Sequence, residues 1–497
     1  MKKIVTLSLV AAMGTTMAFG STASDLRAMK AEIAKLKTEV STLKKGGDTA
    51  KIKKLTKKIN EVKAHDAGDN IKWGVDMRTS IDSINYDMAD GSDRSKNDLM
   101  SMRLWLNMAY APDSHNIFKG QLSMNKSFGA KFSMPGQFDH FDWTGNEALT
   151  DNSLKVRQAY WLYMGDSLFS ADVPWTFSVG RRPSTGGFLG NLRNDDVAQS
   201  PLAHVIDVEF DGLSSKLDLS NVTGIPGMSF KICMGQGTTN AQPLIGSATP
   251  NANGDGSQLE DIKLGGFIFE PYNDGQYIVK ATWYRAYDLP GMVQDFNNNG
   301  APVQDPTFGS YAFKQYGDIE GAALSFMVDG LTDEGYFADA KIFGSFAWSK
   351  TLPDSNEQML GMMTPNGAIG AKPGESKTGT SYWLGVNLPV TEKGTFGIEY
   401  NHGSKYWRPF TYGEDTMIGS KLATRGDAFE AYFTYQLTDA LSAQLRYTKI
   451  DYDYTGSNGF FGPFATPLSM DQARAFGMGD QVVESAQDAR FYLRYKF

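Results

Sequence analysis

The side chains that could carry out nucleophilic, acid–base or metal chemistry are few and widely spaced in this sequence. The five histidines stand at positions 65, 115, 140, 204 and 402, so no pair has the spacing of zinc ligands. Cys233 is the single cysteine, which excludes an internal disulfide and a cysteine-built metal cluster. No phosphate loop, dinucleotide fingerprint or nucleophile elbow is present. The sequence therefore predicts a protein that is not an enzyme.

One short segment has side chains suited to calcium. Asp295, Asn297 and Asn299 in "DFNNNG" match the first half of a calcium-binding loop. Pro306 stands where the bidentate acid of such a loop is expected, and Asp305 comes one residue early. Calcium is therefore the one cofactor that the sequence suggests, and a flexible asparagine-rich turn is the simpler interpretation.

The N-terminal residues resemble an export signal in their order. Lys2 and Lys3 precede the apolar run 4–12, and small residues follow, with cleavage expected after Gly20 or Ala23. We therefore interpret residues 1–23 as a signal peptide, the alternative being an ordinary buried helix. No run in the chain reaches the 18 or so apolar residues that a membrane-spanning helix needs.

Residues 24–64 carry a heptad pattern and many lysines. The apolar seam has alternating spacings of three and four and comprises Leu26, Met29, Ile33, Leu36, Val40 and Leu43. Glu32 and Glu39 fall at positions that pair with Lys37 and Lys44 of a parallel partner, which favours a self-assembling coiled coil. The alternatives are an amphipathic helix packed on a domain and a helical hairpin. The basic character suggests contact with an anionic cell-wall polymer, or simply a solvated helix face.

From residue 71 onward, apolar residues recur at every second position. In "IKWGVDMRTSID" the odd positions from Ile71 to Ile81 are mostly apolar, and the even positions are polar or glycine. This pattern returns in about sixteen segments: 71–83, 99–110, 117–128, 153–164, 174–181, 204–219, 228–236, 260–270, 276–287, 317–328, 336–349, 380–389, 395–403, 427–437, 440–452 and 488–497. The connections alternate between short and long, beginning with a longer loop after residue 83.

This pattern predicts that residues 65–497 form an all-β transmembrane antiparallel barrel of about 16 strands, with fourteen or eighteen as alternatives. Short turns at one end and long loops at the other are typical of bacterial outer-membrane barrels. A sheet can span lipid only when it is closed, because every backbone polar group must be paired. A soluble β-sandwich or propeller also alternates and is the competing fold.

The last strand carries a specific resemblance. In "FYLRYKF", Phe491, Leu493, Tyr495 and Phe497 alternate with polar residues, and this resembles the closing strand of outer-membrane porins. In those proteins the closing strand is the signal that the barrel-assembly machinery reads. The plan of signal, coiled coil and barrel resembles porins with a periplasmic coiled coil, including the phosphate-selective group. It is also similar to a porin-like family of Proteobacteria with stretches like "FSVGRRPSTGG".

The resemblance implies that the loop after the fifth strand, residues 181–204, folds inward and narrows the lumen. An ordinary solvated loop is the alternative. The charged side chains expected at the constriction or along the pore are Arg78, Arg103, Arg157, Arg181, Arg182, Arg193, Asp195, Asp196, Asp207, Glu209, Arg490 and Arg494. Opposed charges across a constriction order polar solutes and bias ion selectivity. The net charge of −8 suggests a mild preference for cations.

The hypothesis from sequence is therefore an outer-membrane porin, a passive channel for small hydrophilic solutes or ions. Its expected partners are outer-membrane lipid and lipopolysaccharide, the barrel-assembly machinery and further copies of itself, and nucleic acid is excluded. Two alternatives are a structural anchor tethered to the cell wall and a sheath for a separate electron-transfer partner. A membrane lipase would need a serine on a strand beside His402, and no serine of the sequence can be assigned that role.

Overall fold

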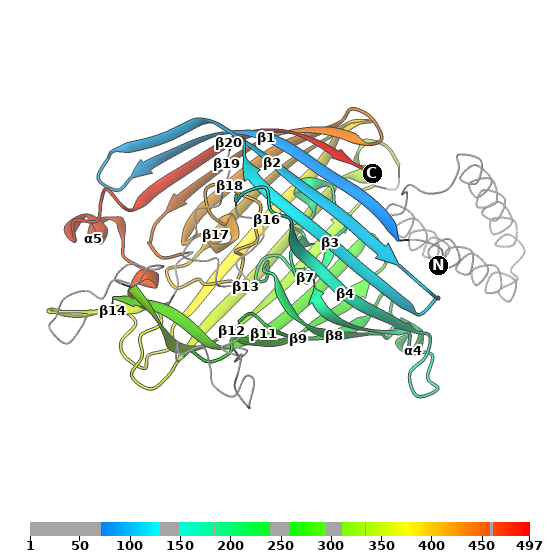
Figure 1. Ribbon diagram of the computed structural model, residues 1–497, viewed down its shortest axis with the longest axis horizontal. Coiled ribbons are helices and arrows are strands. Elements are labelled where there is room, and N and C mark those ends of the chain that lie inside the picture. The colour runs from blue at the N-terminus through cyan, green and yellow to red at the C-terminus, as the bar shows by residue number, and fades with distance from the viewer. Residues whose placement is uncertain are drawn as a thin grey trace, which may run out of the picture.

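A computed structural model describes residues 71–129, 149–182, 184–238, 259–294, 311–332, 334–457 and 461–497. Sixteen antiparallel strands form one closed barrel (Figure 1). In chain order these strands are β1 Lys72–Met88, β2 Asp93–Tyr110, β3 Asn116–Ser127, β4 Lys155–Gly165, β5 Trp175–Arg182, β8 Phe210–Asp218, β9 Ser229–Gln236, β10 Lys263–Asn273, β11 Tyr277–Gln294, β12 Tyr311–Asp329, β13 Lys341–Pro353, β16 Thr378–Thr391, β17 Gly394–Gly403, β18 Gly426–Gln436, β19 Leu441–Tyr452 and β20 Val483–Lys496. The predicted fold class and strand number are thus confirmed.

The barrel closes where the last strand meets the first. β20 pairs with β1 in register, with Arg494 opposite Arg78 and Phe491 opposite Ile81. The seam ends on Phe497, whose backbone N–H donates to Val75 O while Val75 N–H donates to Phe497 O, both at 3.0 Å. The closed sheet therefore leaves no strand edge at the C-terminus.

Alternation along each strand sorts side chains between two faces. On β20, Arg490, Tyr492 and Arg494 are buried inside the barrel, whereas Phe491, Leu493 and Tyr495 are exposed on the outside. Aromatic pairs flank the outer surface, for example Tyr163 with Trp175 and Tyr495 with Phe497 at the short-turn end. An apolar exterior with aromatic girdles is the architecture of a transmembrane β-barrel.

The connections differ between the two ends as the sequence predicted, with one exception. β1 and β2 are joined by a tight turn at residues 89–92, where the sequence analysis expected a longer loop. The expectation was wrong because residues of 84–98 continue both strands, pairing for example Tyr86 with Arg94. Beyond the membrane an outward side chain need not be apolar, so Asn85 is exposed whereas Ile84 is buried inside.

Short elements occupy the connections. They are β6 Gly187–Phe188, η2 Leu192–Asn194, β7 Gln199–Leu202, α4 Ser220–Thr223, η3 Tyr336–Asp339, β14 Gly361–Thr364, β15 Gly367–Gly370, η4 Lys421–Ala423, η5 Pro463–Ala465 and α5 Met470–Ala475. Among the described residues, no helix has the length and apolar character to cross a bilayer.

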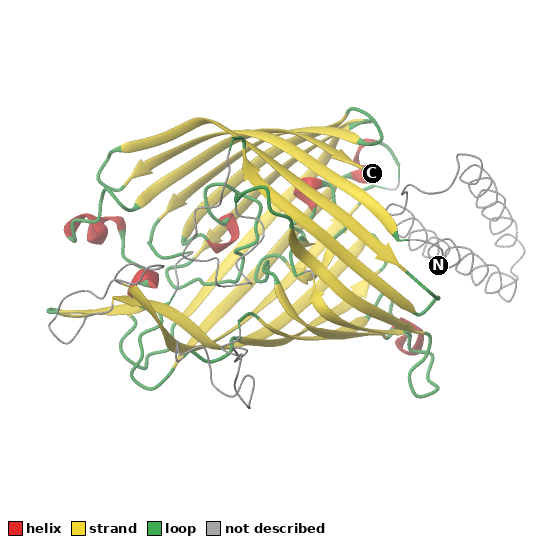
Figure 2. Cartoon of the chain, in the orientation of Figure 1, coloured by secondary structure: helices red, strands yellow, loops and turns green. Residues whose placement is uncertain are grey.

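Two long connections fold into the barrel. We call them loop A, residues 184–209 between β5 and β8, and loop B, residues 404–425 between β17 and β18. Figure 2 shows loop segments and short helices enclosed by the strands in the centre of the barrel. Ile206 of loop A and Phe410 of loop B form a parallel bridge and share an apolar cluster with Tyr284 and Ala347 of the wall. The hydrophobic core of this molecule therefore lies inside the barrel.

Candidate functional site: the interior of the barrel

A row of arginines crosses the closing strands on the inner face. Arg78 of β1 is the Cα partner of Arg103 on β2 and of Arg494 on β20. Like charges directly opposite each other destabilise a sheet unless acids compensate them. Asp76 provides part of this compensation, because it accepts a hydrogen bond of 2.9 Å from Arg494 Nε and lies 3.7 Å from Arg103. All of these side chains are buried.

The remaining compensation comes from loop B. Asp415 accepts hydrogen bonds from Arg78 Nη2 at 2.9 Å and from Arg490 Nη1 at 3.1 Å, and it lies 3.9 Å from Arg103. Burial alone would raise the pKa of Asp415, but the charges of Arg78 and Arg490 outweigh it and hold this pKa well below its usual value. One carboxylate of loop B thus joins three arginines of the wall.

Loop A is attached to the same side of the barrel. Arg193, at the inner tip of the loop, lies 3.2 Å from Glu430 of β18 and 3.3 Å from Glu414 of loop B. Burial would lower the pKa of Arg193, but these two carboxylates raise it well above its usual value. Lys421 of loop B also donates to Glu430, at 2.6 Å, so both loops share one acid of the wall.

Loop A crosses the interior and returns. Near its start, Thr185 accepts a hydrogen bond from Arg157 of β4. Further along, Phe188 packs under Lys280 of β11, and Asp196 accepts a hydrogen bond of 3.0 Å from Arg494 of β20. Near the end of the loop, Ser200 accepts a hydrogen bond of 2.7 Å from Lys231 of β9. The loop is therefore held at several points around the wall, as a constriction would be.

His204 lies at the contact between loop A and the wall. Its Nδ1 lies 2.8 Å from Ser345 Oγ, its Nε2 lies 2.9 Å from Ser381 Oγ, and its ring packs between Trp383 and Trp407. Complete burial lowers the pKa of His204 to about 3, and a hydrogen bond with Asn401 only partly opposes this effect. The imidazole is therefore neutral and serves as a fixed hydrogen-bonding partner.

The structure places the predicted pore residues in two clusters and at four separate positions. Arg78, Arg103, Arg490 and Arg494 gather at the closing strands with Asp415 or Asp76, and Asp196 meets Arg494. Arg157 and Arg181 converge on Glu209, at 3.1 and 2.8 Å. Arg182, Arg193, Asp195 and Asp207 occupy separate places, and Asp195 is exposed after η2.

Four of these residues lie on elements other than the predicted ones. Arg181 and Arg182 belong to β5 and not to the following loop. Asp207 and Glu209 precede β8, although the sequence analysis placed them on a strand 204–219. The backbone of Asp207 donates to Phe410 O at 2.6 Å, so pairing with loop B replaces pairing with a barrel strand at this point.

The residues of loop B were not predicted from the sequence. Ion pairs of Asp415, Glu414 and Lys421 hold both loops in place. These residues lie between two strands, where the alternating pattern of the sequence gives no information. Charged residues concentrated between two alternating segments, as in "YGEDTMIGSK", were the available signal.

Other predictions fall outside the described residues. These are the signal peptide, the coiled-coil seam and the calcium loop at Asp295, Asn297 and Asn299. Within the described ranges, no group of three or more histidine, cysteine or acidic side chains is placed to hold a metal ion.

Comparisons with known proteins give a family and several structures of low similarity. No curated protein matches the sequence. OprB of Pseudomonas putida is 13% identical, with a TM-score of 0.44, 88% of this chain covered and 96% of that chain. The anion-selective porin from Comamonas acidovorans is 12% identical, with a TM-score of 0.46 and coverages of 86% and 99%. OmpF of Salmonella typhi is 12% identical, with a TM-score of 0.42 and coverages of 87% and 99%.

One sequence-family model matches most of the chain. It matches residues 93–497, which include every barrel strand except β1. The chain therefore belongs to the family described as "Protein of unknown function (DUF3373)".

Proposed function

We propose that this protein is an outer-membrane channel of the porin type, which passes small hydrophilic solutes or ions without catalysis. The observation that carries the proposal is a closed barrel with an apolar outer face and a charged inner face that holds two inward-folded loops. Backbone groups of a closed sheet are all paired, so such a barrel can sit in lipid.

The outer face supports the membrane location. Exposed side chains on the barrel strands include Trp161 at 42%, Phe346 at 54% and Leu445 at 59%, which a soluble protein would bury against a second layer. The stacked row of Phe230, Phe267 and Trp283 continues this apolar surface across three neighbouring strands. Hydrocarbon is the environment that stabilises such a surface.

The inner face supports a channel that is narrowed. Loop A is anchored to β4, β9, β11, β18 and β20, and loop B is anchored to β1 and β20. Anchoring by ion pairs, hydrogen bonds and a cation–π contact fixes the loops in one position, which a selective constriction requires. In this proposal the two loops set the width and the charge of the passage.

The direct test is conductance of the purified full chain in planar lipid bilayers. The proposal predicts stepwise, stable ion currents and solute-dependent swelling of liposomes that contain the protein. Folding is checked by heat-modifiable migration on gels, and a heat-denatured sample serves as the control. Barrels that are folded and inserted but never conduct would contradict the proposal.

The finer features of the proposal concern partners. We propose that residues 24–64 form a periplasmic coiled coil that promotes homo-oligomers and contacts the cell wall. We also propose that the outer surface contacts lipopolysaccharide, and that Phe491, Leu493, Tyr495 and Phe497 are read by the barrel-assembly machinery. Chemical crosslinking of the full chain, with and without residues 24–64, measures the oligomer directly.

A further inference from the structure

One part of the inner wall is lined by small residues. Along the register from β5 to β10, Ser178, Ser214, Cys233 and Gly266 are successive Cα partners facing inward. A neighbouring inward row contains Gly180, Gly212 and Gly235. Cys233 and Gly266 of the first row line a pocket that remains between the wall and loop A, whose residues 200–202 and 206 form its other side.

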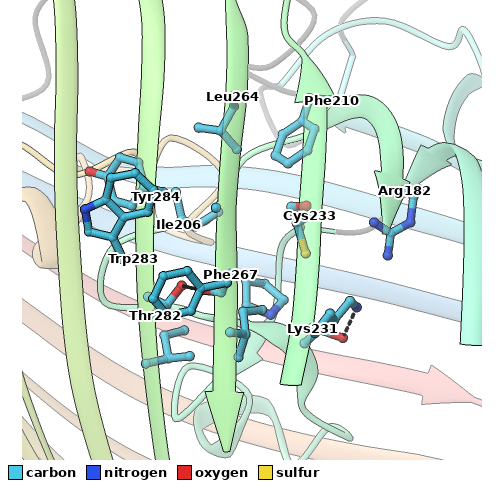
Figure 3. A pocket seen from close by; sticks show the side chains of 16 residues that line it. Arg182, Ile206, Phe210, Lys231, Cys233, Leu264, Phe267, Thr282, Trp283 and Tyr284 are labelled. Carbon is cyan, nitrogen blue, oxygen red and sulfur yellow. Dashed lines mark hydrogen bonds between the residues drawn. The ribbon is translucent and has the colours of Figure 1, made fainter. Parts of the chain in front are cut away.

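The pocket has a polar side and an apolar side. In Figure 3, Arg182, Cys233 and Lys231 lie together on one side, and Ile206 and Tyr284 lie on the other. Ser184 and Ser200 of loop A add hydroxyl groups, and Leu202, Phe210, Leu264 and Ile268 add apolar surface. No aspartate or glutamate is among the lining residues.

The cations at this pocket differ from those elsewhere in the barrel. Arg182 is only 7% exposed, its Nε has no hydrogen-bond partner among the described residues, and its guanidinium group interacts electrostatically with Cys233. Lys231 donates to Ser200 Oγ at 2.7 Å. In the described part of the chain, no carboxylate lies within 4.0 Å of the charged nitrogens of Arg182, Lys216 or Lys231.

A third positive charge stands beside the pocket. Lys216 of β8 is the direct Cα partner of Lys231, and both side chains face inward. Like charges in this position destabilise a strand pair, and the charge of Lys231 also interacts with those of Arg182, Lys216 and Lys280. Among the residues that the structure describes, Lys280 alone of these four has a carboxylate within 4.0 Å, that of Glu270 at 3.4 Å. An anion in the pocket would compensate the charge that the wall leaves uncompensated.

We propose that this pocket binds a small organic carboxylate, with its carboxylate between Arg182 and Lys231 and its hydrocarbon part against Leu264, Ile268 and Ile206. A buried arginine without an acid, a lysine and hydroxyl donors match a carboxylate, since charge-assisted hydrogen bonds of this kind are the strong ones. The apolar lining favours a short hydrocarbon chain over inorganic phosphate. The role of this pocket as a solute site in a channel rests on the proposed function. Binding of a carboxylate to the pocket does not depend on that function.

Cys233 provides a test that needs no current through a channel. It is the single cysteine of the chain, it lines the pocket and it is partly exposed. In detergent-folded protein, we expect an anionic methanethiosulfonate to modify it faster than a cationic reagent of similar size. We also expect butyrate to slow the modification, with butanol of the same chain length having no effect.

Variants then assign the effect to the cations. Lys231→Gln should weaken protection by butyrate about tenfold or more, as loss of one charge-assisted hydrogen bond predicts, and Lys231→Arg should restore it. Arg182→Gln should act in the same direction. Lys449→Gln on the outer face of β19 removes an equal charge far from the pocket and should change nothing.

Three results would overturn the inference: faster modification by the cationic reagent, no protection by butyrate, or equal protection by phosphate at the same concentration. Heat-modifiable migration confirms that each variant is folded. Because labelling is measured in detergent, a protein that binds butyrate but does not conduct disproves only the channel. A protein that conducts but shows no protection disproves only the pocket.

Discussion

At the scale of single residues, the interior depends on a few charges that have several partners each. Asp415 pairs with both Arg78 and Arg490, and Glu430 pairs with both Arg193 and Lys421. Removing one partner from a buried ion pair leaves an uncompensated charge, which costs far more than a surface ion pair contributes. The loops should therefore respond sharply to single substitutions.

The first prediction concerns Asp415. Asp415→Asn keeps the size of the side chain but removes the charge that compensates the arginines of β1 and β20. We expect a loss of stability of about 3–5 kcal/mol and a larger or noisier single-channel conductance as loop B is released. Thermal unfolding in detergent and bilayer recordings measure the two effects.

Asp439→Asn is the matched control, because Asp439 is exposed in the short turn between β18 and β19. It should leave both quantities unchanged. An Asp415→Asn protein with wild-type stability and conductance would show that loop B is not held by this carboxylate.

The second prediction concerns pH and His204. Its pKa is about 3 in the folded protein because of burial, against an ordinary value of about 6.5. The unfolded chain therefore binds a proton that the folded chain does not, so stability falls as pH drops below about 6.5 and continues to fall toward 3. At pH 5 the loss is about 2 kcal/mol.

His204→Gln should remove this pH dependence, because glutamine keeps hydrogen-bonding groups near Ser345 and Ser381 but does not titrate. The measurement is the difference in thermal midpoint between pH 7 and pH 5, compared for the two proteins. An equal difference in both would show that other groups cause the dependence.

At the scale of elements, the seam between β1 and β20 decides whether a barrel exists. The last residue takes part in it through two backbone hydrogen bonds with Val75. An open seam would leave unpaired backbone groups facing lipid, each of which is costly. The terminal strand therefore has a structural role in addition to the assembly role that its resemblance implies.

The third prediction is that deleting Phe497 causes a severalfold loss of folded barrel in the outer membrane. The amount of heat-modifiable protein in membrane fractions is the readout. Phe433→Ala on β18 removes an outward aromatic side chain with nearly the same exposure, 36% against 37%, and should have a much smaller effect. Equal losses would indicate a general need for apolar surface instead of a special role for the last residue.

At the scale of the whole molecule, charge is distributed unevenly inside the barrel. The chain has a net charge of −8, which by itself suggests a preference for cations. Inside, acids and bases pair closely along β18, β20, β1 and β2, whereas Lys216, Lys231 and Arg182 face inward with no carboxylate of the described residues within 4.0 Å. Selectivity follows the charges at the passage and not the total.

The fourth prediction concerns the segment before the barrel. Because the closed sheet begins at Lys72, deleting residues 24–64 should leave folding and single-channel conductance intact. If these residues form the proposed coiled coil, the deletion should also reduce crosslinked oligomers. A deleted protein that fails to fold in detergent would show that the barrel needs this segment.

The sequence by itself determined the barrel. Alternation with period two is a local property, and it assigned Phe491 to the outside and Arg490 to the inside before any contact was known. Lipid and water act on every strand in the same way, so sixteen strands could be predicted one segment at a time. The strand ends at residues 84–98 escaped this reasoning, because there the outward side chains are polar while Ile84 and Met88 are buried inside.

Only the tertiary structure decided how the interior is arranged. Arg193 meets Glu430, 237 residues away in sequence, and Arg78 meets Asp415, 337 residues away. No local period relates such partners. Their pairing follows from closure of the barrel and from the inward path of loops A and B, which bring distant charges into a space with little water. In that space each charge must find an opposite one, and sequence alone does not tell which.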